Sequence, residues 1–93
     1  METTITKRDW WDAGCAKKDI DIAEVCAALG QTITETVKGM SWEGFCSWVY
    51  KTLTGQELET PRYHGRGRCS RYYGEALAKV WPHGGPVPKE EFF

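Results

Sequence analysis

The sequence predicts a compact all-α domain of four or five short helices, followed by an extended C-terminal tail. Apolar residues recur at helical spacing in several separate stretches, and glycine or proline lies between them. With 93 residues, 41% of them apolar, and five tryptophans, the chain has material for one folded core. We therefore expect a single helical domain over residues 1–81 and a Gly/Pro-rich tail over residues 82–93.

The first helix is predicted by Thr6 followed by Asp9, a pattern typical of a helix N-terminus. We expect this helix to continue to about Ala16. Gly14 lies within it and weakens it by roughly 1 kcal/mol relative to alanine, so the pattern leaves its end open.

The second helix follows an aspartate, either Asp19 or Asp21, that can serve as its N-cap. Gly30 is a natural stop for this helix. Between them apolar residues fall at i, i+3, i+4 and i+7, at Ile22, Val25, Cys26 and Leu29.

The segment that follows suits two kinds of structure. Thr32 and Glu35 have the spacing of a capping box, which favours a helix. The β-branched residues around them would suit a strand equally well. A strand, however, would put Glu35 on the same face as Ile33 and Val37, so we expect a short helix.

The clearest helix begins after Ser41 and ends at Gly55. Its apolar residues form one stripe about 100° wide: Trp42, Phe45, Cys46, Val49 and Leu53. Trp48 lies off that stripe by roughly a third of a turn. We expect Trp48 either to pack against a second neighbour or to be exposed.

Residues 55–69 contain Pro61, Gly65 and Gly67 and predict a loop. We expect Ser70 to cap a last helix that Pro82 stops. The predicted buried face of this helix consists of Tyr73, Ala76, Leu77, Val80 and Trp81. Its exposed face consists of Arg71, Glu75 and Lys79, of which the last two form an i, i+4 ion pair. The aromatic residues expected to dominate the core are Trp11, Trp42, Phe45 and Trp81.

The four cysteines show no CxxC pair, and neither histidine has zinc-finger spacing from a cysteine pair. Cys26 and Cys46 fall on apolar stripes, so we expect buried structural thiols and no metal or other cofactor. The N-terminal residues lack the continuous apolar stretch of a secretory signal, and no apolar run is long enough to cross a membrane. These features favour a cytoplasmic protein with reduced thiols.

Charge is distributed unevenly along the chain. Residues 1–61 carry six Lys or Arg against ten Asp or Glu, whereas residues 62–81 carry five against one. This short basic segment contains a group of arginines, tyrosines and a histidine that we take as the candidate binding site: Arg62, Tyr63, His64, Arg66, Arg68, Arg71 and Tyr72. Guanidinium groups bind phosphates or carboxylates in a bidentate manner, and tyrosines stack on bases or pack against proteins. The alternative is that this segment has no binding role and is a solvated loop. Its arginines would then pair with carboxylates of the same chain, at Asp19, Asp21, Glu57 and Glu59.

From this segment we expect a small, non-enzymatic binding protein, because the sequence holds no recognisable catalytic motif and His64 lacks an obvious catalytic partner. Nucleic acid is the first candidate partner, with the arginines on phosphates. The second is an acidic protein surface, bound by a small inhibitor or adaptor such as a phage or mobile-element product that blocks a host complex. The possible apolar anchors in that case are Trp48, Phe92 and Phe93.

Overall fold

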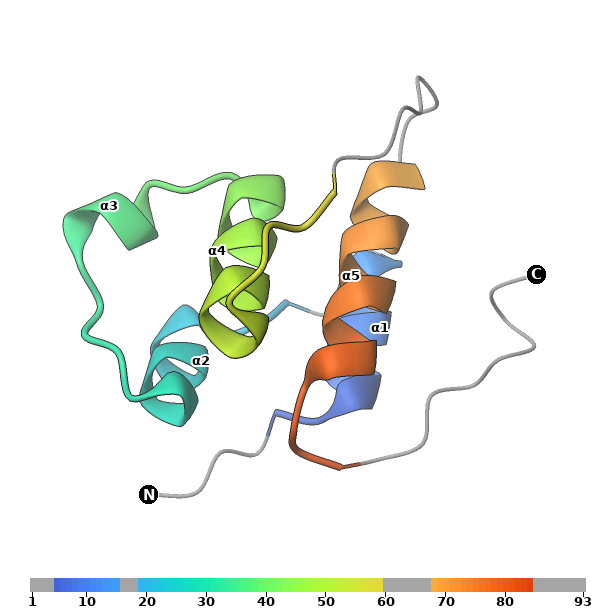
Figure 1. Cartoon of the computed structure of the whole chain (residues 1–93), viewed down its shortest axis with the longest axis horizontal. Coiled ribbons are helices and arrows are strands. Elements are labelled where there is room, and N and C mark those ends of the chain that lie inside the picture. Colours follow the sequence, from blue (N-terminus) through green and yellow to red (C-terminus); the bar gives the residue numbers. More distant parts are fainter. Residues whose placement is uncertain (1–4, 16–18, 60–67, 85–93) are drawn as a thin grey trace.

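A computed structural model describes residues 5–15, 19–59 and 68–84. The described part contains five helices and no strand, as the sequence predicts: α1 (Lys7–Gly14), α2 (Ile22–Leu29), α3 (Glu35–Lys38), α4 (Trp42–Thr54) and α5 (Arg68–Val80). They form one compact all-α unit (Figure 1). The expected tail is described only to Gly84, where no helix follows α5, and its remainder lies outside the described residues.

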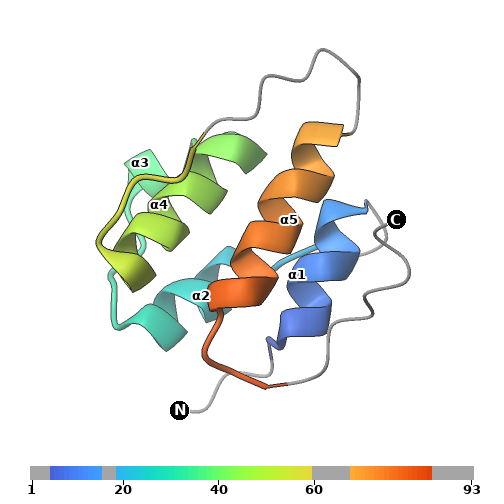
Figure 2. The same ribbon diagram turned by 45° about the vertical axis from the view of Figure 1, so that its right-hand side comes forward.

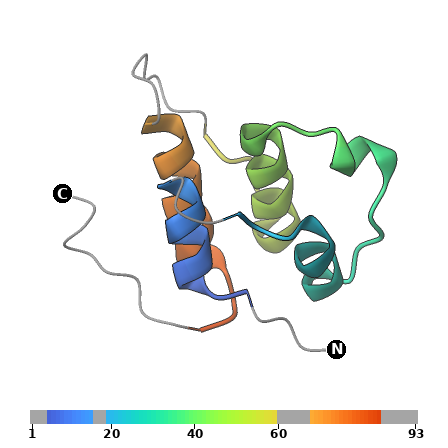
Figure 3. The same cartoon turned by 180° about the vertical axis from the view of Figure 1, so that it is seen from behind.

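Helix α5 is the central element, because it packs against both α1 and α4. Figure 2 shows α1 running antiparallel to α5, while α4 runs in the same direction as α5 on its other side. Helix α3 lies beyond α4, farthest from the α1–α5 pair (Figures 1 and 3). The parallel course of α4 and α5 places the N-termini of both helices at the same end of the molecule.

The core is built around Trp10, which is fully buried and contacts three other aromatic rings. Its ring centroid lies 5.4 Å from that of Trp81, 6.1 Å from that of Trp42 and 6.3 Å from that of Phe45. The sequence patterns pointed to Trp11, which is also buried, but missed this more central neighbour. Trp42 was expected in the core and is only partly buried.

Two predicted N-caps are confirmed and one choice is resolved. Thr6 forms a reciprocal capping box with Asp9, and the Ser41 hydroxyl accepts a hydrogen bond from the Gly44 N–H. Of the two aspartate candidates, Asp21 caps α2. Gly30 (φ 69°) and Gly55 (φ 75°) end α2 and α4 in the left-handed conformation that glycine adopts without strain.

Two predicted caps are wrong, and the structure fixes one boundary that the sequence left open. Helix α1 ends at Gly14, where α1 and α5 cross. Thr34 rather than Thr32 caps α3, because its hydroxyl accepts a hydrogen bond from the Val37 N–H. Helix α5 begins at Arg68, so Ser70 is not its cap. The Ser70 carbonyl instead accepts a hydrogen bond from the Trp42 indole at 3.4 Å, a tertiary contact that local sequence does not encode.

Helices α1 and α5 approach each other so closely that two glycines meet at the crossing. A Cβ placed on Gly74 would lie 2.6 Å from the Trp10 carbonyl oxygen and 2.7 Å from Gly14 Cα. A Cβ placed on Gly14 would lie 2.9 Å from the Ser70 carbonyl oxygen. Any side chain at either position would therefore push the two helices apart.

We expect Gly74→Ala to lower the free energy of unfolding by about 1–3 kcal/mol, because the added methyl group meets backbone atoms that cannot move aside. Urea unfolding followed by far-UV circular dichroism measures this change. The matched control is Gly39→Ala, whose Cβ would lie 3.5 Å from its nearest neighbour, an ordinary contact. Equal stability of both variants and the natural protein would contradict the close crossing.

The two fully buried indoles of Trp10 and Trp81 differ in their hydrogen bonding. Trp81 Nε1 donates to the Ile5 carbonyl at 2.9 Å, whereas Trp10 Nε1 has no hydrogen-bond partner among the described residues. We expect Trp81→Phe to lower the free energy of unfolding by about 1 kcal/mol more than Trp10→Phe, since only the former removes a buried hydrogen bond. Urea titration of both variants compares them, and a larger loss in Trp10→Phe would count against this assignment.

Candidate functional site

The candidate binding segment is only partly described. Arg62, Tyr63, His64 and Arg66 lie outside the described residues, as do Phe92 and Phe93. Arg68 is the first residue of α5, and its side chain is not described. The side chains of Arg71 and Tyr72 are described, and both lie in the second turn of α5.

On helix α5, the residues predicted to be in the core and those predicted to be in the binding site differ in exposure. Tyr73 is buried, whereas Arg71 is exposed and Tyr72 is half-buried. The Tyr72 ring packs edge-on against Tyr73, with centroids 5.6 Å apart and an angle of 81° between the ring planes. The buried tyrosine therefore helps to fix the orientation of its half-buried neighbour.

The Arg71 guanidinium forms no ion pair with any carboxylate of the described residues. Two carboxylates that could have neutralised the arginines have other partners. Glu57 accepts a hydrogen bond from Lys51 Nζ at 2.8 Å, and Asp21 accepts one from the Ala23 N–H at the start of α2. Among the described residues, Arg71 therefore makes none of the internal pairs considered from the sequence.

Beside Tyr72 the surface is hollowed between α4, the segment after it and α5. This hollow, which we call the α4–α5 groove, has a volume of about 230 Å³. Its apolar walls come from Tyr50, Leu58, Tyr72, Ala76 and Val80, and its charged lining residues are Glu75 and Lys79. The sequence patterns did not single out Tyr50 and Leu58. These two residues come to line one groove only because residues 56–59 fold back along α4 (Figure 1).

One ion pair lies in the lining of the α4–α5 groove, and a second joins residues that are next to its lining residues Tyr50 and Leu58 in the sequence. Lys79 Nζ lies 3.1 Å from Glu75 Oε1, as the i, i+4 spacing predicts, and Lys51 pairs with Glu57. The hydrogen bond and the charge of Glu57 raise the pKa of Lys51. All four groups are at least partly exposed, so these pairs contribute little to stability. The described lining of the groove thus holds one cation, Lys79, and one carboxylate, Glu75.

Trp48 lies on a different side of α4 from the groove. It is half-buried, and its ring stacks on that of Phe45, three residues earlier in the same helix, with centroids 5.9 Å apart. Residues two positions apart in a helix point about 200° apart. Trp48 and the groove residue Tyr50 therefore face nearly opposite directions, and Trp48 does not line the groove.

The described cysteines behave as the sequence predicts. Cys26 and Cys46 are buried, and Cys15 is half-buried. Burial raises the pKa of both Cys26 and Cys46, and the negative charge of Glu43 raises that of Cys46 further. Both thiols therefore stay protonated and unreactive at neutral pH.

Within residues 5–15, 19–59 and 68–84, no group of three or more His, Cys, Asp or Glu side chains is arranged to hold a metal ion. None of the described helices is long and apolar enough to span a bilayer. Comparison with known proteins gives no match, either to a family model, to a curated relative or to a solved structure. The functional interpretation therefore depends on the residues of the surface itself.

We expect alkylation of the native protein to modify Cys15 at least about tenfold faster than Cys26 and Cys46, because Cys15 is half-buried whereas the other two thiols are buried and must wait for local opening. Peptide-level mass spectrometry after timed iodoacetamide treatment resolves the individual cysteines. Denaturant should abolish the difference, which serves as the control. Rapid native modification of Cys46 would contradict the helix packing described above.

Proposed function

We propose that this is a small non-enzymatic adaptor or inhibitor that binds a partner protein through α5 and the α4–α5 groove. In this proposal Arg71 meets an acidic side chain of the partner, and an apolar side chain of the partner enters the groove beside Tyr72. The candidate residues Arg62, Tyr63, His64 and Arg66 precede α5 in the sequence and lie outside the described residues.

The observation that carries the proposal is an exposed arginine, with no ion pair among the described residues, that directly precedes Tyr72, a residue of a groove with aromatic and aliphatic walls. Protein interfaces are enriched in arginine and tyrosine, and their strongest contacts combine an apolar anchor with a neighbouring polar group. Tyr72 supplies contact area at a low cost in conformational entropy, since packing against Tyr73 already restricts its ring.

The charges around the groove favour a protein over nucleic acid, which reverses the order of the two candidates given by the sequence. Lys51 and Lys79 are each paired with a carboxylate, Glu57 and Glu75. A nucleic acid lying across this surface would bring its phosphates near both carboxylates, and phosphate binding depends on cations free to replace counterions. A protein partner with charges of both signs suits this margin better.

We expect Arg71→Glu to weaken binding of the partner about tenfold or more, because the reversed charge would repel the partner's acidic group. The partner is first captured from source cells on immobilised protein, identified by mass spectrometry and purified. Calorimetric titration then compares the variants. The matched control is Arg8→Glu, since Arg8 lies on α1 and pairs with Asp12.

Titration with single- and double-stranded oligonucleotides at two salt concentrations separates the two classes of partner. If an oligonucleotide binds with an affinity that falls steeply with salt, and the Arg71→Glu variant does not bind it, the partner is nucleic acid and not a protein. Equal affinity of the Arg71→Glu and Arg8→Glu variants for the captured protein would contradict the proposed surface.

A further inference from the structure

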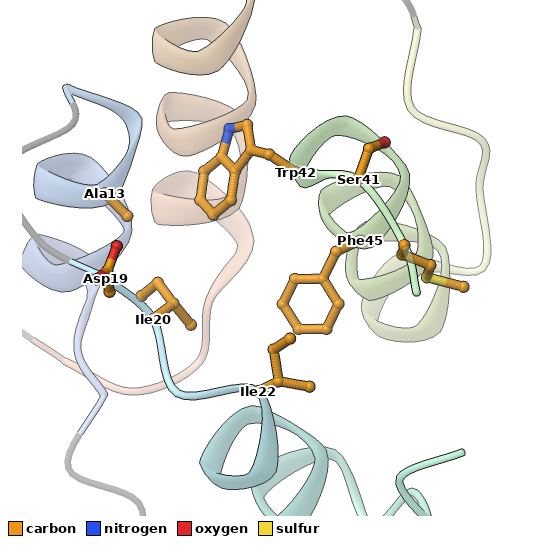
Figure 4. A pocket seen from close by; sticks show the side chains of 8 residues that line it. Ala13, Asp19, Ile20, Ile22, Ser41, Trp42 and Phe45 are labelled. Carbon is orange, nitrogen blue, oxygen red and sulfur yellow. The ribbon is translucent and has the colours of Figure 1, made fainter. Parts of the chain in front are cut away.

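A second and larger hollow lies between α1, the segment that enters α2 and the start of α4. Its volume is about 450 Å³, enough to enclose a large side chain. In Figure 4, Asp19 and Ile20 lie on one side, Trp42 and Phe45 lie opposite them, and Ile22 lies below. Its described lining residues include none of those of the α4–α5 groove.

The aromatic wall of this hollow is held in place. The Trp42 indole N–H donates to the Ser70 carbonyl at 3.4 Å, and the ring lies 6.1 Å from that of the buried Trp10. Trp42 is only partly buried, so part of its surface remains available. A fixed, partly exposed indole attracts cations through the negative face of its ring.

The charged group of the hollow is the carboxylate of Asp19, the one ionisable side chain among its described lining residues. Asp19 is exposed and forms no ion pair with the described residues. The other polar side chain of the lining, Ser41, already accepts the N-cap hydrogen bond from the Gly44 N–H. Among the described lining residues, the polar chemistry of the hollow is therefore that of an anion beside apolar and aromatic walls.

We infer that this hollow binds the side chain of an arginine from a partner protein. The guanidinium would form a bidentate hydrogen bond with Asp19 and stack on Trp42, and the aliphatic stem would contact Ile20 and Phe45. Arginine fits because its planar cation stacks on aromatic rings and pairs with carboxylates. Asp19 would repel an anion. A purely apolar group would remove water from the Asp19 carboxylate without giving it a hydrogen-bond partner, which costs free energy.

The test uses the full chain and three blocked tripeptides, Gly-Arg-Gly, Gly-norleucine-Gly and Gly-Glu-Gly. Heteronuclear NMR follows the Ile20 amide and the Trp42 indole N–H during each titration. We expect saturable shifts with the arginine peptide, weaker shifts with norleucine and none with glutamate. Asp19→Asn should weaken binding of the arginine peptide about threefold or more, the scale of a single exposed ion pair.

The matched control is Glu59→Gln, which removes an exposed carboxylate that does not line the hollow. It should leave the affinity for the arginine peptide unchanged. Three results would overturn the inference: no shift with any peptide, equal affinity for norleucine and arginine, or equal losses in Asp19→Asn and Glu59→Gln. Each is independent of whether the α4–α5 groove binds a protein, because Asp19, Ile20 and Trp42 are not among the residues described as lining that groove.

Discussion

The contact between Gly14 and Gly74 is the constraint on which the rest of this structure depends. Two helices can approach this closely only where neither has a side chain, and here the backbone of α1 touches the backbone of α5. The close crossing lets Trp10 reach Trp81, Trp42 and Phe45 and form the centre of the core. The cost of glycine inside two helices, roughly 1 kcal/mol each, is offset by this packing.

The same crossing determines which residues of α5 remain outside. With Gly74 against α1, the neighbouring Tyr73 and Leu77 are buried, while Arg71 is exposed and Tyr72 is half-buried beside the groove. At the N-terminal end of α5, the Ser70 carbonyl holds the Trp42 indole at the second hollow. Both proposed binding surfaces therefore depend on the position of one helix, although the lining residues described for each are different.

Local patterns in the sequence predict the helices well, because caps and apolar spacing act within a few residues. Thr6, Asp21, Ser41 and Gly55 each mark a boundary through a hydrogen bond or a backbone conformation of their own segment. Contacts between distant segments were not predictable. Nothing in the residues around Gly74 shows that it contacts another helix. Spacing alone does not distinguish the roles of Trp10 and Trp11. Tyr50 and Tyr72 come to line the same groove only after folding. Of the candidate site, the sequence identified Arg71 and Tyr72 but not the groove beside them.

The most direct measurement of the central claim is the nuclear Overhauser effect between the α-protons of Gly14 and Gly74 in the natural protein. A backbone contact this close predicts a strong cross-peak between the two residues, with weaker ones from Gly14 to Arg71. Absence of the Gly14–Gly74 cross-peak, with both resonances assigned, would show that α1 and α5 cross elsewhere. The residues assigned to the exposed face of α5 and to both proposed surfaces would then be wrong.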